Sequence, residues 1–142
     1  MKLKTLIAAL AVALGSLPVL AQVDAKPVRI GFITDMSGLY ADIDGTAGAE
    51  MIRWAVQDFG GKVLGRPVEV LAADHQNKAD VASTKAREWM DKDDLAMLVG
   101  GGSSAANLAM AQIARLKGRP FIYIGGATAR LTNEEWSPYT VH

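Results

Sequence analysis

The sequence predicts an α/β fold built around a doubly wound, Rossmann-like parallel sheet. Short apolar runs bounded by turn residues alternate along the chain with segments whose apolar residues recur at helical spacing. The apolar runs are almost continuous, which is typical of strands that are covered by helices on both faces. Regular alternation of strands and helices indicates a parallel sheet, because each helix is the crossover that returns the chain to the same edge.

The first strand is expected at residues 28–34, an apolar run that ends at turn residues. The first helix is expected at residues 45–59 and ends at Gly60, since glycine tolerates the left-handed conformation of a helix cap. Its apolar residues recur at helical intervals, so we expect them to form one buried stripe. The stripe consists of Met51, Ile52, Ala55, Val56 and Phe59. Trp54 lies off this stripe and is expected at the surface.

Later strands are expected at residues 68–73, 95–99 and 120–124, with helices at 79–90 and 105–117 and the start of a fifth strand at 139–142. A short helical or turn segment at 131–136 precedes the last strand, and its Trp136 is expected to pack against the domain. The residues expected to face inward are Ala82, Ala86, Trp89 and Met90 from one helix, and Ala109, Ile113 and Leu116 from the next.

Composition narrows the class of protein. The chain has 142 residues, of which 50% are hydrophobic and 21% charged, as expected for one globular domain. Lysine plus arginine number 15 and aspartate plus glutamate number 15, so the basic surplus that a nucleic-acid partner requires is missing. The absence of cysteine excludes disulfides, thiolate zinc sites and cysteine nucleophiles.

Residues 1–21 have the three parts of a secretory signal peptide. Two lysines start the segment, an apolar run follows, and Val19-Leu20-Ala21 offers small residues for cleavage before Gln22. Glycine, serine and proline break the apolar run before it reaches the about 20 residues that a spanning helix needs. We therefore expect residues 22–142 to be released into the periplasm, with no membrane-spanning segment after cleavage.

Ligands of open parallel sheets bind outside the carboxyl ends of the strands. Four loops are expected there, at residues 35–44, 74–78, 100–104 and 125–128. Small residues let a ligand approach the backbone, and the helix N-termini that follow favour an anion such as a carboxylate. Each helix end contributes about 0.3–1 kcal/mol, whereas micromolar binding needs about 8 kcal/mol. Hydroxyl hydrogen bonds and a second surface are therefore required.

The third of these loops carries two motifs that enzymes share, and neither motif is complete. Gly100-x-Gly102-x-x-Ala105 matches a loose dinucleotide fingerprint, but the acid expected about 20 residues later is missing. Residues 101–105 resemble a nucleophile elbow, for which a histidine base should follow the serine. His75 precedes the serines, and His142 is the last residue of the expected fifth strand. His75 is interpreted as a loop residue in a polar turn. We expect no catalytic residue, no metal and no cofactor.

Five segments together carry a family resemblance: VRIGFITDMSG at 28–38, GGKVLGRPVEV at 60–70, ADHQNKAD at 73–80, GSSA at 102–105 and GATARLT at 126–132. In order and spacing they resemble the branched-chain amino-acid binding proteins, which are solute-binding proteins of ABC importers with the type I periplasmic-binding fold. The resemblance implies two lobes with a ligand trapped between them. Family chains are more than twice as long, so residues 22–142 would form an incomplete N-terminal lobe.

The resemblance also implies site residues, a ligand class and a partner. In the family, a serine of the third loop and an alanine–threonine pair of the fourth loop hold the ligand carboxylate, and the first loop forms a wall. The matching residues are Ser103 or Ser104, Ala127 with Thr128, and Tyr40 through Ile43. The implied partner is an ABC transporter permease, and the implied ligand is an amino acid. Residues 37–45 are similar to family members of unclear specificity, some of which take aromatic acids rather than leucine. An aromatic-acid or amide ligand therefore stays open, as do a periplasmic sensor domain and a nucleotide-type α/β enzyme.

Overall fold

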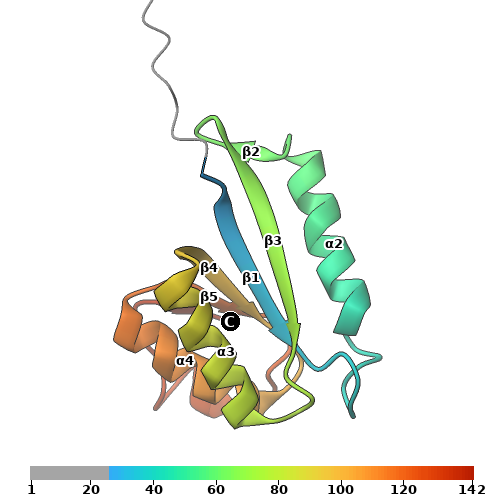
Figure 1. The fold of residues 1–142 in the computed structure, drawn as a ribbon. Coiled ribbons are helices and arrows are strands. Elements are labelled where there is room, and N and C mark those ends of the chain that lie inside the picture. The colour runs from blue at the N-terminus through green and yellow to red at the C-terminus, as the bar shows by residue number, and fades with distance from the viewer. Residues whose placement is uncertain (1–25) are drawn as a thin grey trace, which may run out of the picture.

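The computed structural model describes residues 26–142, which form a six-stranded sheet with helices on both faces (Figure 1). The strand order is β2-β3-β1-β4-β5-β6, and every neighbouring pair is parallel except β2 with β3. The elements are β1 (Val28–Thr34), α2 (Gly45–Asp58), β2 (Lys62–Val63), β3 (Arg66–Asp74), α3 (Ala79–Lys92), β4 (Leu95–Gly100), α4 (Ser104–Lys117), β5 (Phe121–Tyr123), the 3-10 helix η1 (Ala129–Leu131) and β6 (Thr140–Val141). This arrangement confirms the doubly wound α/β fold. The expected signal peptide lies outside the described residues.

The strands lie where the sequence predicts them, with one addition. The two residues of β2 form an antiparallel hairpin with β3, and the turn between them places Leu64 and Gly65 at φ values of 50° and 77°. Two consecutive residues with positive φ are typical of the tight turns that join hairpin strands. A strand of two residues is too short to show a period of two, so the sequence pattern did not reveal it.

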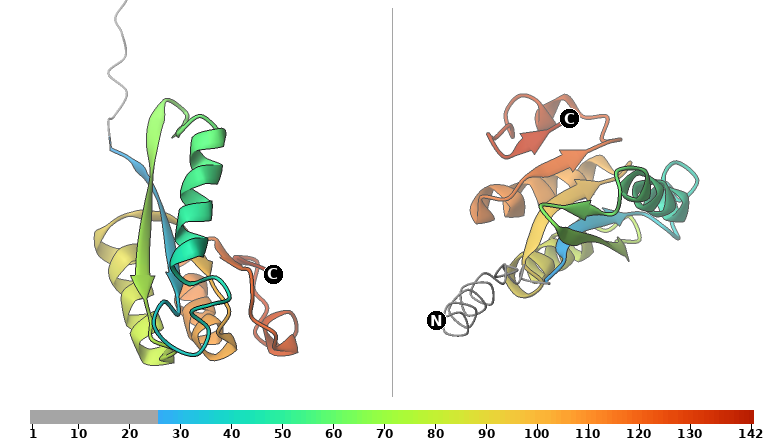
Figure 2. Two further views of the ribbon diagram at one scale, coloured as in Figure 1. Left: turned by 90° about the vertical axis from the view of Figure 1, so that its right-hand side faces the viewer. Right: turned by 90° about the horizontal axis from the view of Figure 1, so that it is seen from above.

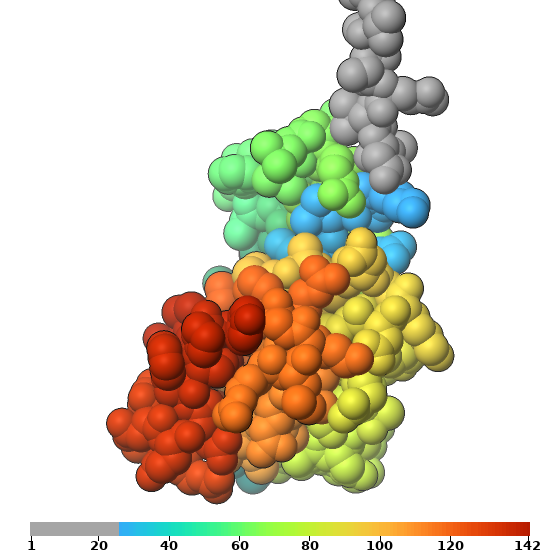
Figure 3. Space-filling view, turned by 90° about the vertical axis from the view of Figure 1, so that its left-hand side faces the viewer, coloured from blue at the N-terminus to red at the C-terminus, as the bar shows by residue number. Residues whose placement is uncertain are grey.

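Helices α3 and α4 pack side by side on one face of the sheet, and α2 lies on the other (Figure 2). Because successive strand residues point to opposite faces, Ile33 of β1 joins the core under α3 and α4, whereas Phe32 packs with Ala49 of α2 and Val99 of β4. The inward residues expected for α3 are all buried: Ala82, Ala86, Trp89 and Met90. Figure 3 shows α3, α4 and the C-terminal segment as one closely packed surface.

Helix α4 buries a different stripe from the expected one. Ile113 is buried as predicted, but the exposed fraction of Leu116 is 73% and Ala109 is only half-buried. The buried face is instead centred on Ala106, Met110 and Ala114. The apolar residues of this helix occupy more than one side, so their spacing alone did not identify the side that faces the sheet.

The stripe expected on α2 is largely exposed, and this corrects the sequence prediction. The exposed fraction of Met51 is 65% and that of Phe59 is 76%, while Ile52 and Val56 are half-buried. On its face of the sheet α2 lies beside an apolar groove of about 560 Å³, which continues into a second hollow of about 420 Å³. We call this surface the α2 groove. It is lined by α2 residues and by Val28, Ile30, Val63, Val68, Met97, Val99, Ile122 and Ile124.

The chain after β5 returns to the sheet as β6, which pairs in parallel with β5 and confirms the strand expected near residue 140. The hydroxyl of Tyr123 donates to the carbonyl of Leu131 at 2.8 Å and ties this return segment to the core. Trp136 has an exposed fraction of 58%, so the expectation that it packs against the domain is wrong. Within residues 26–142, no helix has the length and apolar character needed to cross a bilayer.

Candidate functional site

Three loops meet at the carboxyl edge of the sheet, around Gly102. A Cβ atom on Gly102 would lie 3.6 Å from Cδ1 of Ile43 and 3.8 Å from Cβ of Tyr40, which belong to the loop after β1. A Cβ atom on Gly125, in the loop after β5, would lie only 2.9 Å from Cα of Gly102. The amide of Ala127 donates to Oγ of Ser104 at 3.1 Å. These contacts bring together the first, third and fourth of the loops that the sequence predicts at this edge.

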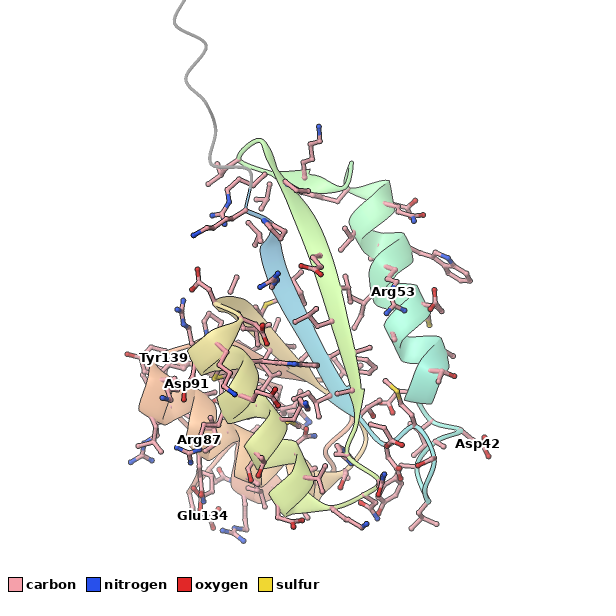
Figure 4. The ribbon with its side chains drawn as sticks, viewed as in Figure 1. Asp42, Arg53, Arg87, Asp91, Glu134 and Tyr139 are labelled. Atoms are coloured by element: carbon pink, nitrogen blue, oxygen red, sulfur yellow. The ribbon has the colours of Figure 1, made fainter. Side chains whose placement is uncertain are left out.

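The loop after β1 is held by a buried carboxylate. Asp35 is fully buried, and its two oxygens accept the amides of Gly38 at 2.7 Å and Tyr40 at 2.9 Å. This turn leaves Tyr40 half-buried and Ile43 with an exposed fraction of 66%. Asp42 in the same loop points away from the sheet (Figure 4). The loop therefore places Tyr40 and Ile43 beside Gly102, and their role as the wall of a ligand site stays a prediction.

Asp74 at the end of β3 ties the first loop to the second. Its Oδ1 accepts the amides of Met36 at 2.9 Å and Gln76 at 2.7 Å, and its Oδ2 accepts the hydroxyl of Ser37 at 2.5 Å. Burial raises the pKa of Asp74, but these hydrogen bonds outweigh it and hold the pKa below its usual value of 3.8. The ionised carboxylate thus fixes the relative position of the two loops.

Two of the three glycines at the end of β4, Gly100 and Gly101, pack closely against the interior of the domain. A Cβ atom on Gly100 would overlap the Asn107 side chain, and one on Gly101 would overlap Thr34 and Asp44. The hydroxyl of Thr34 donates to Oδ1 of Asp44 at 2.7 Å, and Oδ2 of Asp44 is buried against Gly101. Gly102 is the glycine of this run that faces the two wall residues.

The two serines at the start of α4 occupy different environments. Ser103 is 2% exposed; its hydroxyl donates to Oδ1 of Asn77 at 2.8 Å and accepts the amide of Ala106, which makes it the N-cap of α4. Ser104 is half-buried, and its Oγ accepts the amide of Ala127. The two serines thus differ in burial, with Ser104 at the open edge and Ser103 beneath it, and which of them contacts a ligand stays a prediction.

The remaining predicted residues lie in the loop after β5. Ala127 is exposed, and Thr128 is half-buried with its Oγ1 accepting the amide of Arg130 at 3.4 Å. Ala127 is the residue whose amide donates to Ser104, and Thr128 follows it in sequence. Gly102 and Gly125 thus bring together four of the predicted residues, Tyr40, Ile43, Ser104 and Ala127. Thr128 is next to Ala127 in sequence. Their role in ligand binding stays a prediction.

His75 lies in the polar loop after β3, as interpreted from the sequence, and its side chain is buried there. The exposed fraction of His75 is 1%, and its Nδ1 accepts the amide of Asn77 at 2.9 Å. Burial lowers the pKa of His75 below 6.5, and the nearby carboxylates of Asp35 and Asp74 oppose this only in part. Among residues 26–142, no cluster of three or more potential metal ligands is present.

The fold and this edge can be compared with known proteins. The sequence profile of the periplasmic binding protein family matches residues 27–142. The chain belongs to the periplasmic binding protein family. A search of curated proteins found no match.

Solved structures of this family superpose on the chain. A periplasmic binding protein from Burkholderia mallei is 62% identical, with a TM-score of 0.81, and the alignment covers 83% of this chain and 32% of that one. A branched-chain amino-acid ABC transporter ligand-binding protein from Burkholderia xenovorans is 34% identical, with a TM-score of 0.75, and the alignment covers 81% of this chain and 31% of that one.

A solute-binding protein of an ABC transporter from R. palustris, solved in complex with benzoate, is 25% identical, with a TM-score of 0.73. That alignment covers 80% of this chain and 31% of the other. The chain thus spans about a third of the length of these family members.

Proposed function

We propose that this protein is the solute-binding component of an ABC importer, which captures a small carboxylate in the periplasm and delivers it to a membrane permease. The single observation that supports this best is the arrangement at the carboxyl edge of the sheet, in a member of the periplasmic binding protein family. Ser104 at the start of α4 meets Ala127 of the neighbouring loop, with the apolar wall of Tyr40 and Ile43 beside them.

The hydroxyl of Ser104 is suited to bind an anion. Its oxygen already accepts the amide of Ala127, so its own proton is available to donate outward. The first amides of α4 lack partners within the helix, and the helix dipole adds about 0.3–1 kcal/mol for a negative charge at this end. A hydrogen bond to a charged group contributes about 1.5–3 kcal/mol. These terms fall short of the about 8 kcal/mol of micromolar binding, so the proposal includes a second surface that closes over the ligand.

Two ligand classes fit this edge. One solved relative is a branched-chain amino-acid binding protein, and another holds benzoate. An amino acid would also need an acid for its ammonium group, and Asp35 and Asp74 already use their carboxylates on the loops. An aromatic carboxylate needs only the anion site and an apolar wall, which the wall of Tyr40 and Ile43 supplies. The acid for an amino acid's ammonium group would come from the second surface, so leucine, isoleucine and valine stay candidates and an aromatic acid is a second candidate.

Calorimetry with the protein in its full natural length tests the proposal. The titrants are leucine, benzoate, 4-hydroxybenzoate and benzamide. Benzoate and benzamide form a matched pair that differs in the charge of one group. Binding of leucine or of a benzoate, with benzamide much weaker, is the expected result. Benzamide that binds as tightly as benzoate would remove the anion site from the proposal, and no binding of any carboxylate would contradict the ligand class.

Export is proposed on the signal-like pattern of residues 1–21. N-terminal sequencing of the protein recovered from the periplasm is expected to begin at Gln22, or at Lys26 if cleavage follows Val23-Asp24-Ala25 instead. A soluble protein that retains Met1 would contradict export by this route.

A further inference from the structure

Three residues join the second loop to the start of α4. The amide of Asn77 donates to Nδ1 of His75 at 2.9 Å, and the hydroxyl of Ser103 donates to Oδ1 of Asn77 at 2.8 Å. Ser103 is the N-cap of α4, and the first helical residue is Ser104. Hydrogen bonds therefore connect a buried imidazole, through Asn77, to Ser103, which directly precedes the residue that we place at the ligand.

The direction of these bonds fixes the form of the imidazole. An amide N–H can only donate, so Nδ1 of His75 carries no proton and the neutral ring carries its proton on Nε2. Within residues 26–142, Nε2 is buried and has no hydrogen-bond partner. The backbone of His75 is also held in place, because its amide donates to the carbonyl of Thr34 at 2.9 Å.

The backbone that this imidazole supports adopts an uncommon conformation. Gln76 and Asn77 both have φ of 53°, a region that residues other than glycine rarely occupy. The amide of Gln76 is held by Asp74, and the amide of Asn77 is held by His75. Such a strained backbone conformation persists only where several surrounding contacts hold it in place. Loss of the acceptor on His75 would free Asn77 and, with it, the partner of Ser103.

We propose that His75 is a positioning residue of the ligand site: its neutral ring holds Asn77, Asn77 holds Ser103, and Ser103 sets the start of α4 and hence Ser104. The inference rests on the proposed function, since it assigns a role toward that site. Protonation of Nδ1 replaces the acceptor by a donor that faces the N–H of Asn77, so the chain of hydrogen bonds breaks and ligand affinity falls.

The charged groups that face His75 come from two sides. Asp35 and Asp44 belong to the loop after β1, and Asp74 precedes His75 on β3. All three favour a positive ring, whereas burial opposes it and is the larger effect, so the pKa of His75 stays below 6.5. The neutral form therefore prevails at neutral pH, and the break is expected only as the pH falls through the lowered pKa of His75.

Two variants of the full-length protein separate positioning from packing. His75→Asn places an oxygen close to the position of Nδ1, although it removes more volume. His75→Leu fills more of the space but has no acceptor. Titration with benzoate and with leucine should show His75→Asn within about twofold of wild type and His75→Leu weaker by about fivefold, the equivalent of one ordinary hydrogen bond. As the pH falls through the lowered pKa of His75, wild-type affinity should decline by more than that of His75→Asn.

Equal affinity losses in both variants, or a pH profile that His75→Asn does not flatten, would overturn the proposal. Hydrogen exchange provides a readout without ligand. At one pH, the amides of Asn77 and Ala106 should exchange faster in His75→Leu than in wild type and at wild-type rates in His75→Asn. If no carboxylate binds the wild type, the proposed function fails, and the exchange rates still decide whether His75 positions α4. Unchanged rates in His75→Leu would refute that positioning.

Discussion

Alanine replacement of Ser103 should lower mainly the stability of the protein, and alanine replacement of Ser104 should lower mainly its ligand affinity. Ser103→Ala removes the N-cap of α4 and the hydrogen bond to Asn77. A cap contributes about 0.5–2 kcal/mol, and a neutral hydrogen bond adds about 0.5–1.5 kcal/mol. Because Asn77 is exposed and water can replace its lost partner, we expect the low end of the sum. The free energy of unfolding should fall by about 1–2 kcal/mol.

Ser104→Ala removes a half-buried hydroxyl that, among residues 26–142, accepts a hydrogen bond from the amide of the exposed Ala127. Stability should change by less than about 0.5 kcal/mol, since solvent can replace that contact. Ligand affinity should fall by about 10- to 150-fold if the hydroxyl donates to a carboxylate. Ser103→Ala should lower affinity by less, because it acts on the ligand only through the position of α4.

Urea unfolding measures the free energy of unfolding, and calorimetry with benzoate and leucine measures the ligand affinity. Both use the full-length protein. Ser83→Ala is a matched control, since its hydroxyl bonds the Asp80 carbonyl on the remote helix α3. Ser104→Ala with full affinity, combined with a large affinity loss in Ser103→Ala, would show that the buried serine contacts the ligand and that the assignment at this edge is reversed.

Three further expectations follow from the structure. Gly101→Ala should lower the free energy of unfolding by about 1–3 kcal/mol, because the added Cβ overlaps its buried neighbours. Gly102→Ala makes only ordinary contacts, so it should keep the stability and weaken ligand binding. Urea unfolding measures the stability of each variant, and calorimetry measures its ligand affinity. Because the pKa of Asp74 is lowered in the folded state, its stabilisation is complete above pH 3.8 and is lost as the pH falls through the folded pKa, so Asp74→Asn should flatten the acid limb of a pH series of unfolding free energies. Residues 22–142 expressed alone should self-associate through the α2 groove and bind ligand at best in the millimolar range, about 4 kcal/mol; in sedimentation, Phe59→Lys in the groove should reduce association and Trp54→Lys outside it should not.

The order and type of the main elements could be predicted from the sequence, because strand and helix periods depend on neighbouring residues. The buried face of α3 was predicted correctly for the same reason: its apolar residues lie on one side. The faces of α2 and α4 were not. Met51, Phe59 and Leu116 have the spacing of core residues, but whether a helix side is covered depends on what the tertiary structure places against it.

The candidate site divides in the same way. The sequence by itself determined which loops lie at the carboxyl edge, since that follows from the alternation of strands and helices. Only the tertiary structure decided that Ser103 lies beneath Ser104, that Gly101 packs against Thr34, and that His75 is buried. Each of these depends on contacts of loop residues with parts of the chain that are distant in sequence, and local patterns of polarity carry no information about such contacts.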